Sequence, residues 1–176
     1  MAAKPKKERG TMSKKIVLSI DGGVTGAGAI AWRDGTIEIF DLPIIKTDNF
    51  PGVAPYAFDA IVKSVIDRAG GSANVVAYVE RSILLPVNGK QTIRATYDCR
   101  GVIRAVLALN NVSLIYVPPQ TWKKFHGIPP KSDKEHSRGL ALQLRPDLAG
   151  LLARKKDHNR AEAILLGLYG KEVAAK

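Results

Sequence analysis

Two acidic side chains stand where they could do chemistry, each at the end of an apolar, β-branched segment. Asp21 follows the run 16–20, and Glu80 follows the run 74–79. Both runs are typical of buried strands, and an unpaired carboxylate at the end of such a strand is costly. Asp21 alone could simply close a hairpin through an Asx turn. Two acids placed in this way instead indicate a site at the mouth of a sheet, where ligands and metals are held.

A third polar cluster lies near the C-terminus, where Asp157, His158 and Glu162 occur close together. Glu162 opens an apolar helix, and His158 shares its face if the helix begins early enough to include both. Asp157 would lie beside them or cap the helix start. Clustered carboxylates repel one another unless a cation joins them, so Asp21, Glu80, Asp157 and Glu162 are predicted as hard oxygen ligands for Mg²⁺ or Mn²⁺.

Length and composition bound the class of protein. With 176 residues, of which 45% are hydrophobic and 24% charged, the chain is expected to form one globular domain with a proper core. It shows no apolar run of the roughly 20 residues that span a membrane and no signal peptide. The single Cys99 excludes an internal disulfide and is expected to be a small core residue. These features favour a cytoplasmic protein without membrane contact.

The net charge of +11 points to a polyanionic partner. Part of this charge belongs to residues 1–14, which are expected to be a basic, disordered arm, but the predicted domain at 15–176 is also basic. Such a field favours nucleic acid, although an acidic protein or a membrane surface would also be attracted.

Hydrophobic periodicity and turn residues predict the elements that would position these acids. Three antiparallel strands come first, and helices then alternate with two further strands, which indicates an α/β fold with a mixed sheet flanked by helices. The segment 118–133 is expected to be a basic loop. The predicted strands are 15–20, 26–32, 36–41, 74–80 and 112–117, and the predicted helices are 54–69, 92–109, 133–144 and 159–173.

Four motifs, in the right order over residues 15–170, resemble the RuvC family of Holliday-junction resolvases, and most of all its compact phage members. They are 20–23 with Thr25-Gly26, Val79-Glu80, 118–123 and 157–163. The resemblance implies an RNase H-like fold with a five-stranded mixed sheet. It also implies a homodimer that makes two symmetric nicks in a four-way DNA junction with two Mg²⁺ or Mn²⁺ ions per site, and no small-molecule cofactor. A phage-encoded protein would act inside a bacterial host.

The resemblance carries over Asp21 and Glu80 as metal ligands, with Glu162 and either Asp157 or His158 completing the site. Two metal ions about 3.5–4 Å apart stabilise the attacking and leaving oxygens of a phosphodiester, and Asp21 is the candidate bridging ligand. His158 would order the nucleophilic water or move a proton, or else be a surface histidine beside an acid. A hard oxygen ligand suits Mg²⁺ better than imidazole does, which favours Asp157 slightly as the fourth ligand.

Basic residues flank the predicted site and are expected to contact DNA phosphates, unless they form only a solvated basic face. The loop after Glu80 holds apolar residues at 83–85, which would unstack bases or pack under the loop. Helix 92–109 is apolar over more than one face, which fits either a dimer contact or core packing. The predicted DNA-binding residues are Arg81, Lys90, Arg94, Lys123, Lys124, Lys131, Lys134, Lys155, Lys156 and Arg160.

Three other classes of protein are alternatives to a junction resolvase. An actin-like ATP-binding fold also opens with an acid-glycine hairpin, but it generally needs two related domains. A YqgF-like RNase H-fold nuclease would act on RNA, and a non-catalytic relative would only bind nucleic acid. The sequence does not separate DNA junctions from other branched or RNA substrates.

Overall fold

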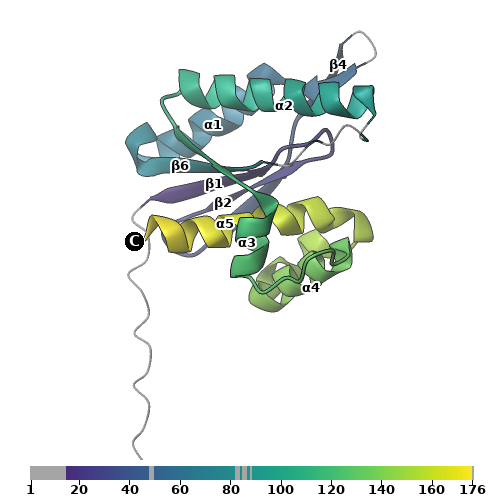
Figure 1. Ribbon diagram of the computed structural model, residues 1–176. Coiled ribbons are helices and arrows are strands. Elements are labelled where there is room, and N and C mark those ends of the chain that lie inside the picture. Colours follow the sequence, from purple (N-terminus) through teal and green to yellow (C-terminus); the bar gives the residue numbers. More distant parts are fainter. Residues whose placement is uncertain (1–14, 48–49, 82–83, 85–86, 88, 176) are drawn as a thin grey trace, which may run out of the picture.

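A five-stranded mixed sheet forms the centre of the protein (Figure 1), as the sequence predicts. Its order is β3-β2-β1-β6-β7, in which the first three strands are antiparallel while β1, β6 and β7 run parallel. The structure, a computed structural model, describes residues 15–47, 50–81, 84, 87 and 89–175, so the predicted arm at 1–14 lies outside the described residues. The strands are β1 (Ile16–Asp21), β2 (Ala27–Ala31), β3 (Ile37–Asp41), β6 (Val75–Glu80) and β7 (Ser113–Val117).

Helices cover both faces of the sheet (Figure 1). One face carries α1 and α2, and the other carries α5 with α3 and α4 beside it. No helix in the described part of the chain is long and apolar enough to cross a bilayer. The helices are α1 (Pro55–Ala69), α2 (Lys90–Leu109), α3 (Pro119–Phe125), α4 (Lys134–Leu144) and α5 (His158–Ala174).

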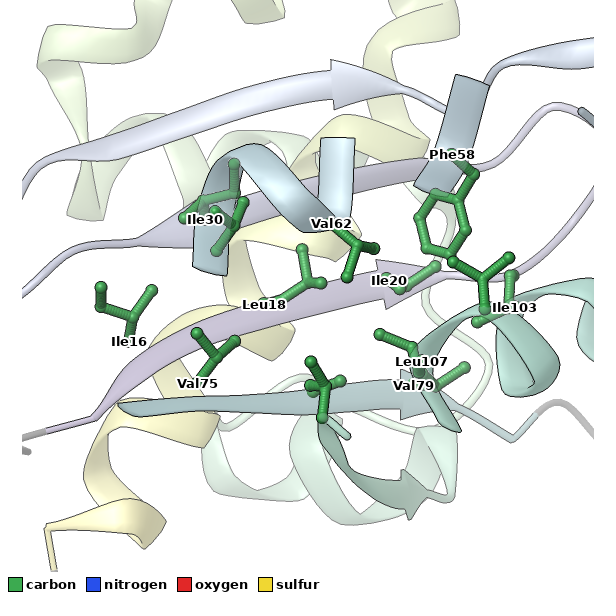
Figure 2. Close-up of a cluster of buried hydrophobic side chains, with 14 of the residues drawn as sticks. Ile16, Leu18, Ile20, Ile30, Phe58, Val62, Val75, Val79, Ile103 and Leu107 are labelled. Carbon is green, nitrogen blue, oxygen red and sulfur yellow. The ribbon is translucent and has the colours of Figure 1, made fainter. Parts of the chain in front are cut away.

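The strict alternation of a strand decides which residue faces which helix layer. Ile16, Leu18 and Ile20 of β1 point to α1 and α2, where they pack against Phe58 and Leu107 (Figure 2). The residues between them point to the opposite layer. This alternation fixes the direction of any side chain at the end of the strand.

The helix α5 lies unusually close to the sheet. Ser19, which is fully buried in β1, has its hydroxyl 2.7 Å from the carbonyl oxygen of Ala163. A Cβ atom at Gly170 would come within 2.8 Å of Val17 and Tyr78, so only glycine permits this approach. With Ala163 beside Ser19 and Gly170 beside Val17, α5 runs back along β1, so its first turns lie towards the carboxyl end of the strand.

The structure differs from the sequence prediction in three places. The expected loop at 118–133 begins with the helix α3, because a proline at the first helical position is compatible with a helix. A small hairpin, β4 (Ile44–Thr47) with β5 (Phe50–Val53), was not predicted. The last helix begins at His158, so Glu162 lies one turn inside α5 and does not open it.

The predicted contact face of α2 is narrower than its sequence suggests. Ile103, Val106 and Leu107 are buried in the core of their own chain, whereas Tyr97 and Leu109 are 60% and 81% exposed. Cys99 is fully buried in the same core, as predicted. Core packing therefore explains most of the apolar character of α2.

Candidate active site

Asp21 and Glu80 are neighbours because β1 and β6 run parallel and in register. Ile20 pairs with Val79, so the next residues along the two strands stand side by side at their carboxyl ends. Ile20 and Val79 point into the core under α1 and α2. By alternation, Asp21 and Glu80 therefore both face the α5 layer.

Glu80 is held by a tryptophan from α3. The indole Nε1 of Trp122 donates a hydrogen bond of 2.9 Å to Oε2 of Glu80. Trp122 is fully buried and Glu80 is 8% exposed, so water competes little for this bond. Trp122 therefore positions the Glu80 carboxylate, a role that its sequence context did not indicate.

Glu162 reaches the same place from α5. Its Oε1 lies 3.0 Å from the ammonium of Lys123 and 3.4 Å from the hydroxyl of Ser137. Only 13% of the Glu162 side chain is exposed. The consecutive residues Trp122 and Lys123 of α3 thus each contact one carboxylate, Glu80 and Glu162 respectively.

The electrostatics of Asp21 reflect its burial and its two acidic neighbours. Its pKa rises from 3.8 to about 8, chiefly because burial removes water from the carboxyl group, and then because Glu80 and Glu162 lie nearby. Lys134 and Lys123 act in the opposite direction without balancing these effects. Without a cation, Asp21 is therefore largely protonated at neutral pH.

Solved structures that share this fold include two of RuvC from Thermus thermophilus. The chain superimposes on RuvC in complex with a Holliday junction substrate with a TM-score of 0.54 and 16% identity, covering 87% of this chain and 91% of that one. A second RuvC structure gives a TM-score of 0.51 and 17% identity, over 89% and 97% of the two chains. The protein has a RuvC-like fold. No protein-family model and no curated protein matches its sequence.

Asp157 lies in a different electrostatic environment. Its carboxylate accepts hydrogen bonds from the backbone N–H of Arg154 and from that guanidinium, at 2.9 and 2.8 Å. These bonds, and to a smaller extent the charge of Arg160, lower its pKa to about 2. The Asp157 carboxylate thus closes the short 3₁₀ turn Lys155–Asp157 and makes no capping hydrogen bond to α5. The slight preference for it as the fourth ligand has no support in this geometry.

His158 instead connects to the site through Lys134. Nε2 of His158 lies 2.9 Å from the ammonium of Lys134, and Nδ1 lies 3.1 Å from the carbonyl oxygen of Lys155. An ammonium only donates and a carbonyl only accepts, so His158 is the neutral Nδ1–H tautomer with Nε2 as acceptor. Lys134 is also one of the cations that act on Asp21, so Lys134 links His158 to the carboxylates indirectly.

The donor set around Asp21 suits a hard divalent cation, since it offers carboxylate oxygens from acids that act unfavourably on one another. In the part of the chain that the structure describes, no three His, Cys, Asp or Glu side chains already form a cage for an ion. Lys123 occupies one oxygen of Glu162. The residues fit a metal in chemical type, and binding would require Glu162 to exchange this ammonium for the cation.

The predicted DNA-binding residues divide into two groups. Lys124, Lys131, Lys134, Lys155 and Lys156 are exposed on the segments around α3, α4 and the start of α5, with the half-buried Lys123 among them.

Arg81, Lys90 and Arg94 are exposed on the α2 side of the sheet. Arg160 differs from both groups, because its guanidinium makes two hydrogen bonds of 2.6 and 2.7 Å to Asp41. Its side chain is only 22% exposed, so Arg160 supports the fold. Of the predicted apolar wedge, only Leu84 belongs to the described residues.

Proposed function

We propose that this RuvC-like protein is a metal-dependent endonuclease that resolves four-way DNA junctions by paired, symmetric nicks. The observation that supports this most directly is the meeting of Asp21, Glu80 and Glu162 at one end of the sheet. Crowded, desolvated acids are costly to a fold and cluster at functional sites. The likeness to a RuvC solved with a Holliday junction supports the substrate class.

The chain's own residues have distinct roles in this proposal. Two Mg²⁺ or Mn²⁺ ions, when bound, would stabilise the charge on the attacking and leaving oxygens of the phosphodiester. Asp21 would bridge them, Glu80 would bind one and Glu162 the other. His158 is the fourth member in place of Asp157, and its Nε2 would accept the proton of the attacking water once Lys134 turns to a phosphate.

The exposed lysines around α3 and α4 would contact the phosphates of the cleaved strand. Lys134 acts on the Asp21 carboxyl group, and Lys124, Lys131, Lys155 and Lys156 are exposed on the same segments of the chain. Arg81, Lys90 and Arg94 would contact a second arm. Such contacts position DNA and make binding salt-dependent, but they read little sequence.

Paired nicks need two active sites, and we propose a twofold homodimer that uses the exposed side of α2. This side carries the small residues Gly101, Ala105 and Ala108 next to the exposed Leu109, which permits close approach of a second helix. Sedimentation at micromolar concentration should give twice the monomer mass. A strict monomer, both free and on DNA, would contradict the paired-nick mechanism.

The decisive experiment compares labelled four-way junction, linear duplex and structured RNA, each with and without Mg²⁺, using Asp21→Asn as the matched inactive control. We expect cleavage of the junction alone, at symmetric positions and only with metal. Cleavage of RNA in preference to the junction would favour a YqgF-like activity. Tight junction binding without cleavage in Mg²⁺ or Mn²⁺ would favour a non-catalytic relative.

A further inference from the structure

A cavity of about 760 Å³ lies between α3 and the start of α4, next to Glu162. Ligand sites in proteins typically measure about 300–1,000 Å³. The wall of the cavity is formed by the segment 127–132, which connects the two helices. Its size is suited to a small organic group of the dimensions of a nucleotide.

The cavity is continuous with the proposed active site, because two residues belong to both. Lys123 and Ser137 line the cavity, and both contact Oε1 of Glu162. A group that fills the cavity therefore lies directly beside Glu162. In a nucleic acid strand cleaved at the carboxylates, that group would be a nucleotide adjacent to the scissile phosphate.

The lining has the chemistry of a nucleotide site. Lys123, Lys124 and Lys131 supply positive charge, and none of the described residues that line the cavity is acidic. Ile128 and the neighbouring prolines supply an apolar surface for a base, while the amide of Gln120 can donate to and accept from a base edge. The cavity therefore offers lysines for a phosphate, an apolar surface for the face of a base and an amide for its polar edge.

The wall of the cavity is built by defined local structure. Ile128 N–H bonds to the carbonyl of Lys123 at 2.9 Å, and Gly127 N–H bonds to that of Lys124 at 3.1 Å. With Gly127 at a φ of 70°, this pattern is a Schellman motif that ends α3. The wall is therefore preformed.

Lys131 sits in a conformation that a lysine normally avoids. Its φ is 64°, and the N–H of Ser132 bonds to the carbonyl of Pro129, so Lys131 takes the third position of a type II turn. Glycine favours this position, because a left-handed residue with a Cβ is sterically strained. A strained residue at the edge of a cavity is a reason to look for a function.

We propose that the cavity between α3 and α4 binds the nucleotide next to the scissile phosphate of the cleaved DNA strand, with its phosphate on Lys124 and Lys131. The proposal rests on the proposed function above and adds to it a binding site for the cleaved strand. A phosphate contact would explain why a lysine, Lys131, occupies a backbone position that favours glycine.

The first test separates the charge of Lys131 from its backbone strain. Lys131→Gly should leave the melting temperature unchanged or raise it, because glycine adopts the positive φ freely. It should also lower the slope of log Kd for junction DNA against log salt by about one. Lys63→Ala, which removes an equal charge from the exposed side of α1, should leave the slope unchanged.

The second test locates the nucleotide by disulfide crosslinking. Ser132→Cys places a thiol at the cavity, and the native Cys99 is fully buried and does not compete. Junctions carry a thiol-tethered base at successive positions across the branch point of one strand. Crosslinking should peak at one position next to the cleavage site, and Ser64→Cys on α1 should give no such peak.

The outcomes separate this proposal from the proposed function. If the protein cleaves junctions but Ser132→Cys gives no position-dependent crosslink, the nucleotide site is wrong and the nuclease stands. If no junction is cleaved but the crosslink still peaks at one position, the cavity binds DNA and the nuclease is wrong. A normal salt slope for Lys131→Gly would remove Lys131 from the site.

Discussion

Two groups of carboxylates at the ends of β1 and α5 experience opposite electrostatics. Around Asp21, burial and two further acids raise the pKa to about 8. Around Asp157, the guanidinium of Arg154 lowers the pKa to about 2. At neutral pH and without a cation, Asp21 is therefore largely protonated, whereas Asp157 is fully ionised.

The difference lies in the partner of each acid. Arginine offers a fixed fork of donors that satisfies a carboxylate completely, so Asp157 and Asp41 are already paired and free of any need for a cation. Near Asp21, Glu162 pairs with Lys123 and Glu80 accepts the indole N–H of Trp122, and both acids still raise the pKa of Asp21. An acid that costs stability as it stands is the better candidate for a ligand site.

The largest expected effect comes from removing the central carboxylate. Asp21→Asn keeps the shape of the side chain but removes its charge, and should lower Mg²⁺-dependent cleavage by about 10³-fold or more. Glu80→Gln should act similarly, while junction binding stays within about threefold of wild type. Steady-state cleavage and a gel-shift titration measure these two properties.

Retention of a tenth of the wild-type cleavage in either variant would contradict the assignment. Asp41→Asn is the matched control, since it removes an acid that pairs with Arg160 outside the site.

Much of this fold could be predicted from the sequence, because its strands have clear patterns. The runs ending at Asp21 and Glu80 are apolar and bounded by turns, and both predicted strands are confirmed, each with its acid as the last residue. The hairpin of β4 and β5 was missed because its strands have four residues each, one of them with Pro51, and no alternation. The short α3 was missed because its opening prolines resemble a loop.

The site was harder to predict, because its arrangement depends on partners distant in sequence. Asp21 and Glu80 could be placed together from parallel strands alone, but the bond from Trp122 to Glu80 crosses 42 positions of sequence. The choice between Asp157 and His158 depended on Arg154 and Lys134, whose side-chain directions no sequence pattern fixes.

A second expected effect distinguishes the two neighbours at the start of α5. His158→Ala should lower cleavage by about 10²-fold, the cost of a lost proton-transfer or water-orienting group. Asp157→Asn should leave the rate within about threefold of wild type, because its carboxylate faces Arg154. The exposed His136 of α4 provides a control, and His136→Ala should change nothing. A reversed order of the two losses would restore Asp157 as the ligand.

A smaller effect is expected from the indole that holds Glu80. Trp122→Phe removes the Nε1 donor and should raise the Mg²⁺ concentration for half-maximal cleavage by about tenfold, the equivalent of about 1.4 kcal/mol for a buried hydrogen bond. The metal-induced rise in melting temperature should shrink in parallel.

Trp32→Phe, on the other side of the sheet, controls for the loss of an indole and should leave the metal response unchanged. An equal loss in both variants would reduce Trp122 to a packing role.

The last expected effect is on stability without metal, not on cleavage, and it has opposite signs for the two aspartates. The pKa of Asp21 rises from 3.8 to about 8 on folding, so the native state holds an extra proton between these values and loses stability as pH rises through this window. Asp21→Asn should remove this loss and raise the melting temperature at pH 8 by roughly 4–8 °C, the equivalent of about 2 kcal/mol.

The pKa of Asp157 falls from 3.8 to about 2, so its contribution is complete above the unfolded value and disappears as pH falls towards 2. Because Arg154 is 55% exposed, solvent weakens the pair, and Asp157→Asn should cost about 1 kcal/mol at pH 7. Thermal melts of both variants in chelator, from pH 3 to pH 8.5, measure the direction of each change in stability.

Mg²⁺ must displace the Asp21 proton, so adding it should stabilise the wild type more at pH 8 than at pH 6 and leave Asp21→Asn unaffected. If both substitutions destabilise the protein at pH 8, the acids near Asp21 are compensated after all and the contrast between the two clusters fails.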